Sequence, residues 1–274
     1  MSRINSPLAK QFVLAVILGA TVVAPVKAET IRARYSVNLV GLHIGDATAN
    51  GVLGPQSYKV DLNAHLTGFA ALVVNLKTAF SSSGAILRGA IVPSAYATTS
   101  ATSQETRTVR MALTNGSVKG LEISPPFEDK EGRVPLTEAS KRNIVDPMSA
   151  FIIPVAAGES LVGPAACAKS IPIFDGFTRF DVKLSYAGTR NVSTQGYSGP
   201  VSVCTARYVP VAGHKPDSKS TRFMTENRQI EAWLAPVERA RVVVPYRISL
   251  LTMAGMAVIE ATDFNIESSE VAVH

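Results

Sequence analysis

The stretch IRARYSVNL, residues 31–39, indicates the fold class because its apolar and polar residues alternate strictly. Every second residue from Ile31 to Leu39 is apolar, and the residues between them are Arg, Ser or Asn. A period of two is typical of a β-strand in an antiparallel sheet that has one buried face and one face in water. The stretch YKVDLNAHLT, residues 58–67, alternates in the same way after a Gly-Pro-Gln-Ser turn at residues 54–57.

Further strand signals recur along the chain. Asn115-Gly116 is the strongest kind of short hairpin signal, and it joins apolar residues of 109–113 to a returning strand at 118–123. Residues 180–186 alternate as well, and Phe174-Asp175-Gly176-Phe177 before them predicts a hairpin turn served by its Asp and Gly. Four more strands are predicted over residues 200–209, 228–234, 240–250 and 256–266.

Evidence for helices is limited to two segments. Residues 68–77 (GFAALVVNLK) are compatible with a short helix or with a buried strand. Asp146-Pro147 followed by MSAFII predicts a short helix with Asp146 as N-cap, ended by Pro154. Residues 124–143, which contain the charge cluster EDKEGR, are predicted to be a solvated loop. We therefore predict a mainly β protein, a strongly curved antiparallel sheet or barrel of about ten to fourteen strands with one or two short helices.

Residues 1–28 have the pattern of a secretory signal peptide. Basic residues precede the apolar run FVLAVILGATVVA (residues 12–24), and Val26-Lys27-Ala28 places small residues at the −3 and −1 positions of a cleavage site. A retained membrane anchor is the less favoured alternative, because the run is shorter than the roughly 20 residues that span a bilayer. Cleavage would leave residues 29–274, which we expect to form a single β-rich domain in the periplasm, soluble and without a stable membrane span.

The composition excludes several classes of function. With 46% hydrophobic and 18% charged residues, the chain is too apolar for a disordered protein. The predicted signal peptide holds three basic residues and no acidic one, so its removal lowers the net charge from +6 to +3. A net charge of +3 is too small to indicate nucleic-acid binding. The sequence contains no G-x-S-x-G, H-E-x-x-H, P-loop or dinucleotide fingerprint, and its four histidines are scattered. We therefore predict no catalytic residue, no metal site and no cofactor.

The two cysteines, Cys167 and Cys204, both belong to the predicted exported part. In an oxidising compartment an even count of two most simply makes one structural disulfide. The alternative is a redox-active pair, but such pairs are usually spaced C-x-x-C, and these cysteines are 37 positions apart.

Several motifs resemble domain-of-unknown-function family 3108 of exported Gram-negative proteins. They include CAKSIPIFDGFTRFDVKL from Cys167, YSGPVSVCTARYVPVAGHK from Tyr197, and NIVDPMSA from Asn143. YSVNLVGLHIGDA, SSSGAILRG with PSAY, and AWLAP followed by VPYRISLLTMAG fit as well, so the resemblance covers nearly all of residues 29–274. It implies a periplasmic β-rich fold with paired cysteines and transfers no catalytic or binding residue. The C-terminal part also resembles, more weakly, lipoprotein-carrier barrels, an analogy of fold alone.

The leading hypothesis is a non-catalytic envelope protein, a β-barrel-like module that binds a lipid, an acyl chain or another apolar ligand, or a protein partner. The candidates for an apolar lining alternate on the predicted strands: Tyr35, Val37, Leu39, Val60, Leu62, Leu66, Val182, Leu184, Tyr186, Ile248 and Leu250. The same residues would serve equally well in a packed core without a cavity. Two further hypotheses are a periplasmic hydrolase with an unrecognised carboxylate site and a structural adaptor that pairs through a sheet edge.

Overall fold

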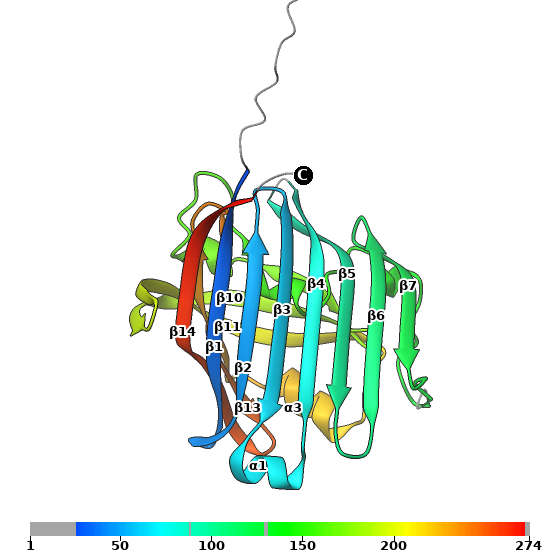
Figure 1. Cartoon of the computed structure of the whole chain (residues 1–274). Helices are drawn as coiled ribbons and strands as arrows, with labels where there is room; N and C mark the ends of the chain where they lie inside the picture. The colour runs from blue at the N-terminus through cyan, green and yellow to red at the C-terminus, as the bar shows by residue number, and fades with distance from the viewer. Residues whose placement is uncertain (1–25, 88, 129–130, 272–274) are drawn as a thin grey trace, which may run out of the picture.

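The computed structural model describes residues 26–87, 89–128 and 131–271, and the predicted signal peptide lies outside these residues up to position 25. The described backbone forms one large antiparallel sheet of 14 strands (Figure 1). The strands are β1 (Val26–Leu39), β2 (Leu42–Leu53), β3 (Ser57–Leu66), β4 (Lys77–Leu87), β5 (Ala90–Ala101), β6 (Thr106–Thr114), β7 (Ser117–Ser124), β8 (Ile153–Pro154), β9 (Ser170–Phe174), β10 (Arg179–Thr194), β11 (Tyr197–Ala212), β12 (Ile230–Val237), β13 (Val242–Thr252) and β14 (Gly255–Val271). The short helices are α1 (Gly68–Val73), α2 (Pro164–Cys167) and α3 (Lys219–Glu226), with single 3₁₀ turns η1 (Ala139–Lys141) and η2 (Ser149–Phe151).

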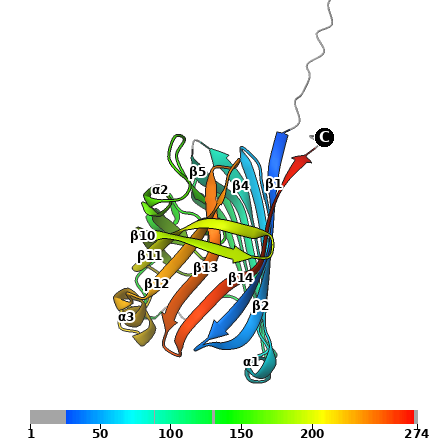
Figure 2. The same cartoon turned by 90° about the vertical axis from the view of Figure 1, so that its left-hand side faces the viewer.

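Strand order brings the two ends of the chain together in the middle of the sheet. The order is β7-β6-β5-β4-β3-β2-β1-β14-β13-β12-β11-β10-β9, and β8 adds to β13. Strands β10 to β13 curl back to lie opposite the first strands, as the two views show (Figures 1 and 2). In the described part of the chain the end strands β7 and β9 do not pair with each other, so the predicted curved sheet is confirmed as strongly curled but not closed.

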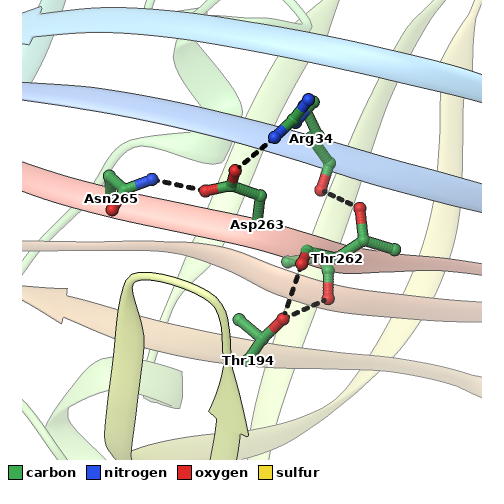
Figure 3. Close-up of polar contacts among 6 residues, drawn as sticks. Arg34, Thr194, Thr262, Asp263 and Asn265 are labelled. Atoms are coloured by element: carbon green, nitrogen blue, oxygen red, sulfur yellow. Dashed lines mark hydrogen bonds and ion pairs between the residues drawn. The ribbon is translucent and has the colours of Figure 1, made fainter.

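The tip of the β10–β11 hairpin fastens the curl by docking on β14 (Figure 3). The hydroxyl of Thr194 donates to the carbonyl oxygen of Thr262 at 2.8 Å, and the N–H of Phe264 donates to the carbonyl oxygen of Gln195 at 2.8 Å. Thr262 lies at an irregularity in the β1–β14 register, where β14 has one residue more than β1. Because such a bulge leaves one residue out of the ladder, its carbonyl is available to the hairpin.

Polar side chains on β1 and β14 surround this contact. Arg34 forms an ion pair with Asp263 at 2.7 Å, and Asn265 also donates to the Asp263 carboxylate (Figure 3). Glycine suits position 196 in this turn, because its φ of 84° lies in the left-handed region that other residues rarely adopt.

Three apolar clusters fill the space between the strands. The main core joins both halves of the sheet and contains Ile31, Ala33, Leu53, Tyr58, Ile86, Ile152, Val201, Ala235, Val237, Ala240, Val242, Val244, Tyr246, Ala261 and Phe264. A second cluster surrounds α2 with Ile153, Val155, Leu161, Ala166, Cys167, Cys204, Leu234 and Val243. A third lies under β5 and β6 with Tyr96, Val109, Met111, Leu113, Ile144, Met148 and Phe174.

The predicted local structure is largely confirmed. The hairpin at Asn115-Gly116 joins β6 to β7, and both residues have the positive φ (49° and 69°) that such a turn requires. Residues 68–77 are compatible in sequence with a short helix or with a buried strand. The structure shows the helix, α1, and none of its residues is buried. The helix predicted after Asp146 is only the 3₁₀ turn η2, because Pro147 and Pro154 leave too little chain between them for an α-helix.

Candidate functional site

The predicted disulfide joins Cys167, at the end of α2, to Cys204 on β11. Their Cα atoms are 5.5 Å apart, and both residues are fully buried in the second cluster. Cys167 is the last residue of its helix, so no helix N-terminus stabilises a thiolate there. Burial and this placement favour a structural bond that fixes α2 to the sheet.

The eleven candidate lining residues do not gather in one place. Ten are partly buried, and Tyr186 is 40% exposed. Four of them pack against the apolar clusters: Tyr35 and Val60 against the main core, Val60 and Leu62 against the third cluster, and Leu184 against the second. The hydroxyl of Tyr35 donates to the carbonyl oxygen of Pro245 at 2.8 Å. Their role as a ligand lining stays a prediction.

A buried polar network crosses the interior at Asp146. This residue is fully buried, and its Oδ1 accepts the backbone N–H groups of Met148 (3.0 Å) and Ser149 (2.9 Å). Its Oδ2 accepts the hydroxyls of Ser149 and of Ser82 on β4, the latter at 3.0 Å. The hydroxyls of Tyr58, on β3, and Ser149 are 2.6 Å apart. The network therefore ties η2 to β3 and β4.

The Asp146 carboxyl is buried and fully hydrogen-bonded within this network. Burial is the largest influence on the Asp146 carboxyl and raises its pKa, although the hydrogen bonds from Ser149, Ser82 and Met148 oppose the rise. No cation contacts the carboxylate among the described residues, and all its hydrogen bonds go to neighbouring protein groups. The network therefore accounts for the position of η2.

In the described part of the chain, no three His, Cys, Asp or Glu side chains come together to hold a metal ion. His43 lies 3.4 Å from Asp46, and both side chains are about half exposed on the surface.

A pocket at the edge of the sheet, beside β7, has the properties that an apolar ligand needs. It has a volume of about 620 Å³, and we call it the edge pocket. It is lined by Leu121, Ile123, Pro126, Phe127, Arg133, Val134, Pro135, Leu136, Lys141, Gly176, Phe177 and Gly213. An acyl chain requires roughly 300 Å³ or more, so the pocket is large enough.

Two aromatic rings form one wall of the edge pocket. Phe127 and Phe177 meet edge to face with their ring centroids 5.0 Å apart. The Arg133 guanidinium lies over the Phe127 ring at 4.6 Å and donates to the carbonyl oxygen of Gly213 at 2.5 Å. Asp175 holds Phe177 in place, because its Oδ1 accepts the Phe177 N–H at 2.8 Å, which confirms the predicted role of this Asp in the turn.

Residues 133–136, in the loop before η1, form a further part of the wall. The backbones of Val134 and of Gly213 and His214 exchange hydrogen bonds of 2.8 and 2.9 Å, which fix residues 133–136 against the end of β11. Lys141 lines the pocket and forms an ion pair with Glu138 at 3.0 Å. The site thus combines aromatic and aliphatic walls with one guanidinium and one ammonium group, a set suited to an acyl chain with an anionic group.

A second hollow, of about 530 Å³, lies over β3 to β7 and shares Leu121 with the edge pocket. It is lined mainly by short side chains such as Ser81, Ser83, Ala95 and Ala97. The edge pocket is larger and has a wall of two packed aromatic rings with Arg133 beside it, so we favour it.

None of the eleven predicted residues lines the edge pocket, and the residues that do were missed from the sequence. Residues 124–143 were predicted to be a solvated loop because of their charges and prolines. The signal that could have indicated a site is the recurrence of Phe127, Val134 and Leu136 among those charges.

Fold and site define a class of protein, a β-barrel-like module whose curled sheet carries an apolar pocket at an open edge. The model of the DUF3108 family of proteins of unknown function matches residues 34–262, and the chain therefore belongs to this family, as its motifs predict. Among solved structures, a β-barrel-like protein of the domain-of-unknown-function family DUF1849 from Brucella abortus is similar, with 12% identity and a TM-score of 0.44 over 89% of this chain and 98% of that one. No curated protein matches the sequence.

Proposed function

We propose that the protein is a non-catalytic envelope module that binds an apolar ligand with an anionic group in the edge pocket. A fatty acid, or an acyl chain of a phospholipid or lipoprotein, has this chemistry. The observation that carries the proposal is the edge pocket itself, about 620 Å³ of mainly apolar lining with Arg133 and Lys141 in its wall. Burial of each methylene in such a site contributes roughly 0.8 kcal/mol, so a chain of several methylenes is enough for measurable binding.

We place the protein in the periplasm. The proposal is supported by the signal-peptide pattern of residues 1–28 and by the disulfide, a bond that persists in oxidising compartments. No helix in the described ranges is long and apolar enough to cross a membrane.

The test is binding of a fluorescent fatty-acid probe, followed by displacement with phospholipid. Leu121 is 39% exposed on β7, so Leu121→Asn should leave the fold intact while placing an amide in the pocket wall. We expect this variant to weaken probe binding by about tenfold, equivalent to roughly 1.4 kcal/mol. Because Leu121 also lines the second hollow, Val134→Asn, at a residue that lines the edge pocket and not that hollow, should weaken binding as well. The matched control is Leu87→Asn, a leucine of similar exposure (47%) at the end of β4 and outside the pocket, which should bind as the wild type does.

Two results would contradict the proposal. One is the absence of probe binding by the wild-type protein. The other is a Leu62→Asn variant that abolishes binding while Leu121→Asn has no effect, because Leu62 packs in the interior and such a result would place the ligand there. Native mass spectrometry of protein purified from its own host adds a direct readout, since a co-purified lipid supports the proposal.

The same spectrum tests a second candidate function, that of an adaptor. The edge of β7 that faces away from β6 has no partner strand among the described residues, and such an edge can accept a strand from another chain. A stoichiometric co-purified polypeptide would favour this function.

A further inference from the structure

Exposed apolar side chains gather at one end of the sheet. The six most exposed large hydrophobic residues in the described chain are Val40, Leu42, Phe69, Leu72, Val73 and Met253, and we call them the apolar tip. Their exposed fractions range from 66% to 83%. They belong to the β1–β2 turn, to α1 and to the β13–β14 turn, at the end of the sheet opposite the chain termini (Figure 1). Contiguous exposed apolar residues of this kind mark interaction sites.

Backbone contacts join the three segments into one surface. The N–H of Val40 donates to the carbonyl oxygen of Met256 at 2.8 Å, which places the β1–β2 turn beside the β13–β14 turn. On the other side, the N–H of Thr67, just before α1, donates to the carbonyl oxygen of Ile44 on β2 at 2.9 Å. The three segments that carry the six residues therefore lie side by side on one rim.

Helix α1 exposes its large apolar side chains and turns its small ones toward the protein, the reverse of the usual arrangement. A helix on a protein surface usually turns its large apolar residues toward the core. In α1 the two alanines, Ala70 and Ala71, are partly buried, whereas Phe69 and Leu72 are 80% and 83% exposed. The large side chains contribute little to the fold in this position, so their exposure calls for a partner outside the chain.

The charges around the tip select the chemistry of that partner. Residues 40–43, 67–77 and 252–256 contain Lys77 and His43 but no carboxylate. Acids close by in the sequence include Asp46, whose carboxylate lies 3.4 Å from His43, and Glu226, which precedes Arg228 by two residues. Arg228 is exposed next to Gln229, whose carbonyl oxygen accepts the N–H of Leu251, two residues before Met253. An exposed apolar surface with Lys77 and Arg228 at its border suits the interface of a phospholipid bilayer, where apolar side chains insert among the headgroups and cations meet phosphates.

We propose that the apolar tip docks on a membrane surface, with Phe69, Leu72 and their neighbours inserted among the headgroups and Lys77 and Arg228 close to anionic phosphates. A bilayer is favoured over a protein groove because the six side chains protrude from three separate turns, and a fluid surface needs no matching shape. The inference does not depend on the edge pocket, because none of the tip residues lines it.

The experiment is co-flotation of the purified full chain, as its host processes it, with vesicles of phosphatidylethanolamine and phosphatidylglycerol. We expect the wild-type protein to float with the vesicles and the double variant Phe69→Ser/Leu72→Ser to bind at least about tenfold more weakly. The matched control is Val52→Ser/Leu87→Ser, two exposed apolar residues near the ends of β2 and β4 away from the tip, which should float as the wild type does. Lys77→Gln/Arg228→Gln should weaken binding to these vesicles several-fold and leave binding to pure phosphatidylcholine unchanged.

Fatty-acid probe binding distinguishes this proposal from the one for the edge pocket, because the tip variants should retain it. Failure of the wild type to float would overturn the membrane assignment, and so would a Phe69→Ser/Leu72→Ser variant that floats like the wild type. Self-association of the wild type in sedimentation velocity, lost in that variant and accompanied by no vesicle binding, would instead assign the tip to a contact between protein chains.

Discussion

Replacement of Asp146 by alanine tests whether the buried network holds η2 against the sheet. The change removes the acceptor of two buried backbone N–H groups, those of Met148 and Ser149. The hydroxyls of Ser82 and Ser149 keep partners in each other at 2.9 Å, so the two N–H groups carry most of the cost. A buried unsatisfied donor costs about 1–3 kcal/mol, and we expect the free energy of unfolding to fall by about 2–5 kcal/mol.

Asp146→Asn separates the hydrogen bonds from the charge. The amide oxygen still accepts the two backbone N–H groups, and its NH₂ group faces hydroxyl oxygens that can accept, so we expect a loss of about 1 kcal/mol near neutral pH. Burial raises the pKa of the Asp146 carboxyl above 3.8, so the folded protein binds more protons than the unfolded chain in the window above that pH. The contribution of Asp146 to the free energy of unfolding of the wild type therefore falls as the pH rises through this window. Asparagine does not titrate, so the Asn variant shows no such pH dependence from this position. The deficit of Asp146→Asn, which is the difference in the free energy of unfolding between the wild type and this variant, should therefore be largest at low pH and become smaller as the pH rises.

The measurement is urea unfolding followed by the fluorescence of Trp233, which is the single tryptophan and is partly buried on β12. Unfolding curves from about pH 4 to about pH 7 cover the part of the window in which the deficit should change. Asp61→Asn serves as control, because its side chain is 44% exposed and lies 4.0 Å from Lys59, so it should change stability by less than about 0.5 kcal/mol. The reasoning is refuted if Asp146→Ala loses less than about 1 kcal/mol, or if the deficit of Asp146→Asn is the same at every pH.

Two further predictions concern export and the disulfide. Intact-mass measurement of the exported protein should give a chain that begins at Glu29, and a retained leader would contradict the periplasmic assignment. Cys167 and Cys204 should label with a thiol reagent only after reduction and unfolding, and Cys167→Ser/Cys204→Ser should unfold about 4 kcal/mol more easily while retaining probe binding. Ready labelling in the native protein would revive the redox alternative.

The strands that could be predicted from the sequence are those with one clearly apolar face. The alternation in residues 31–39 and 58–66 identified β1 and β3, and Asn115-Gly116 identified the β6–β7 turn. Strands β4 and β5 went unpredicted because they are rich in Ala, Ser and Thr, which differ too little in hydrophobicity to show a period. Helix α3 went unpredicted too, because only Phe223 and Met224 in it are large and apolar.

The candidate site could not be predicted because it depends on contacts between distant segments. Phe127 and Phe177 are 50 positions apart, and the edge pocket exists only because the loop before η1 and the β9–β10 turn meet beside β7. Periodicity identifies residues that turn away from water, but it does not show how much volume remains between them. Leu62 and Leu184, for example, pack against apolar clusters in the structure.

The open topology leaves sheet edges, and the edge pocket lies at one of them. A closed barrel has no free edge, and a ligand then enters the interior. Here β1 pairs with β14 in the middle of the sheet, so β7 and β9 remain as edges that need covering. Val145 covers β9 directly, with hydrogen bonds of 2.8 and 3.0 Å to Pro172 and Phe174. Beside β7, Pro126, Phe127 and residues 133–136 line the edge pocket together with Leu121 and Ile123, so the same unpaired edge that leaves the barrel open supplies one wall of the proposed ligand site.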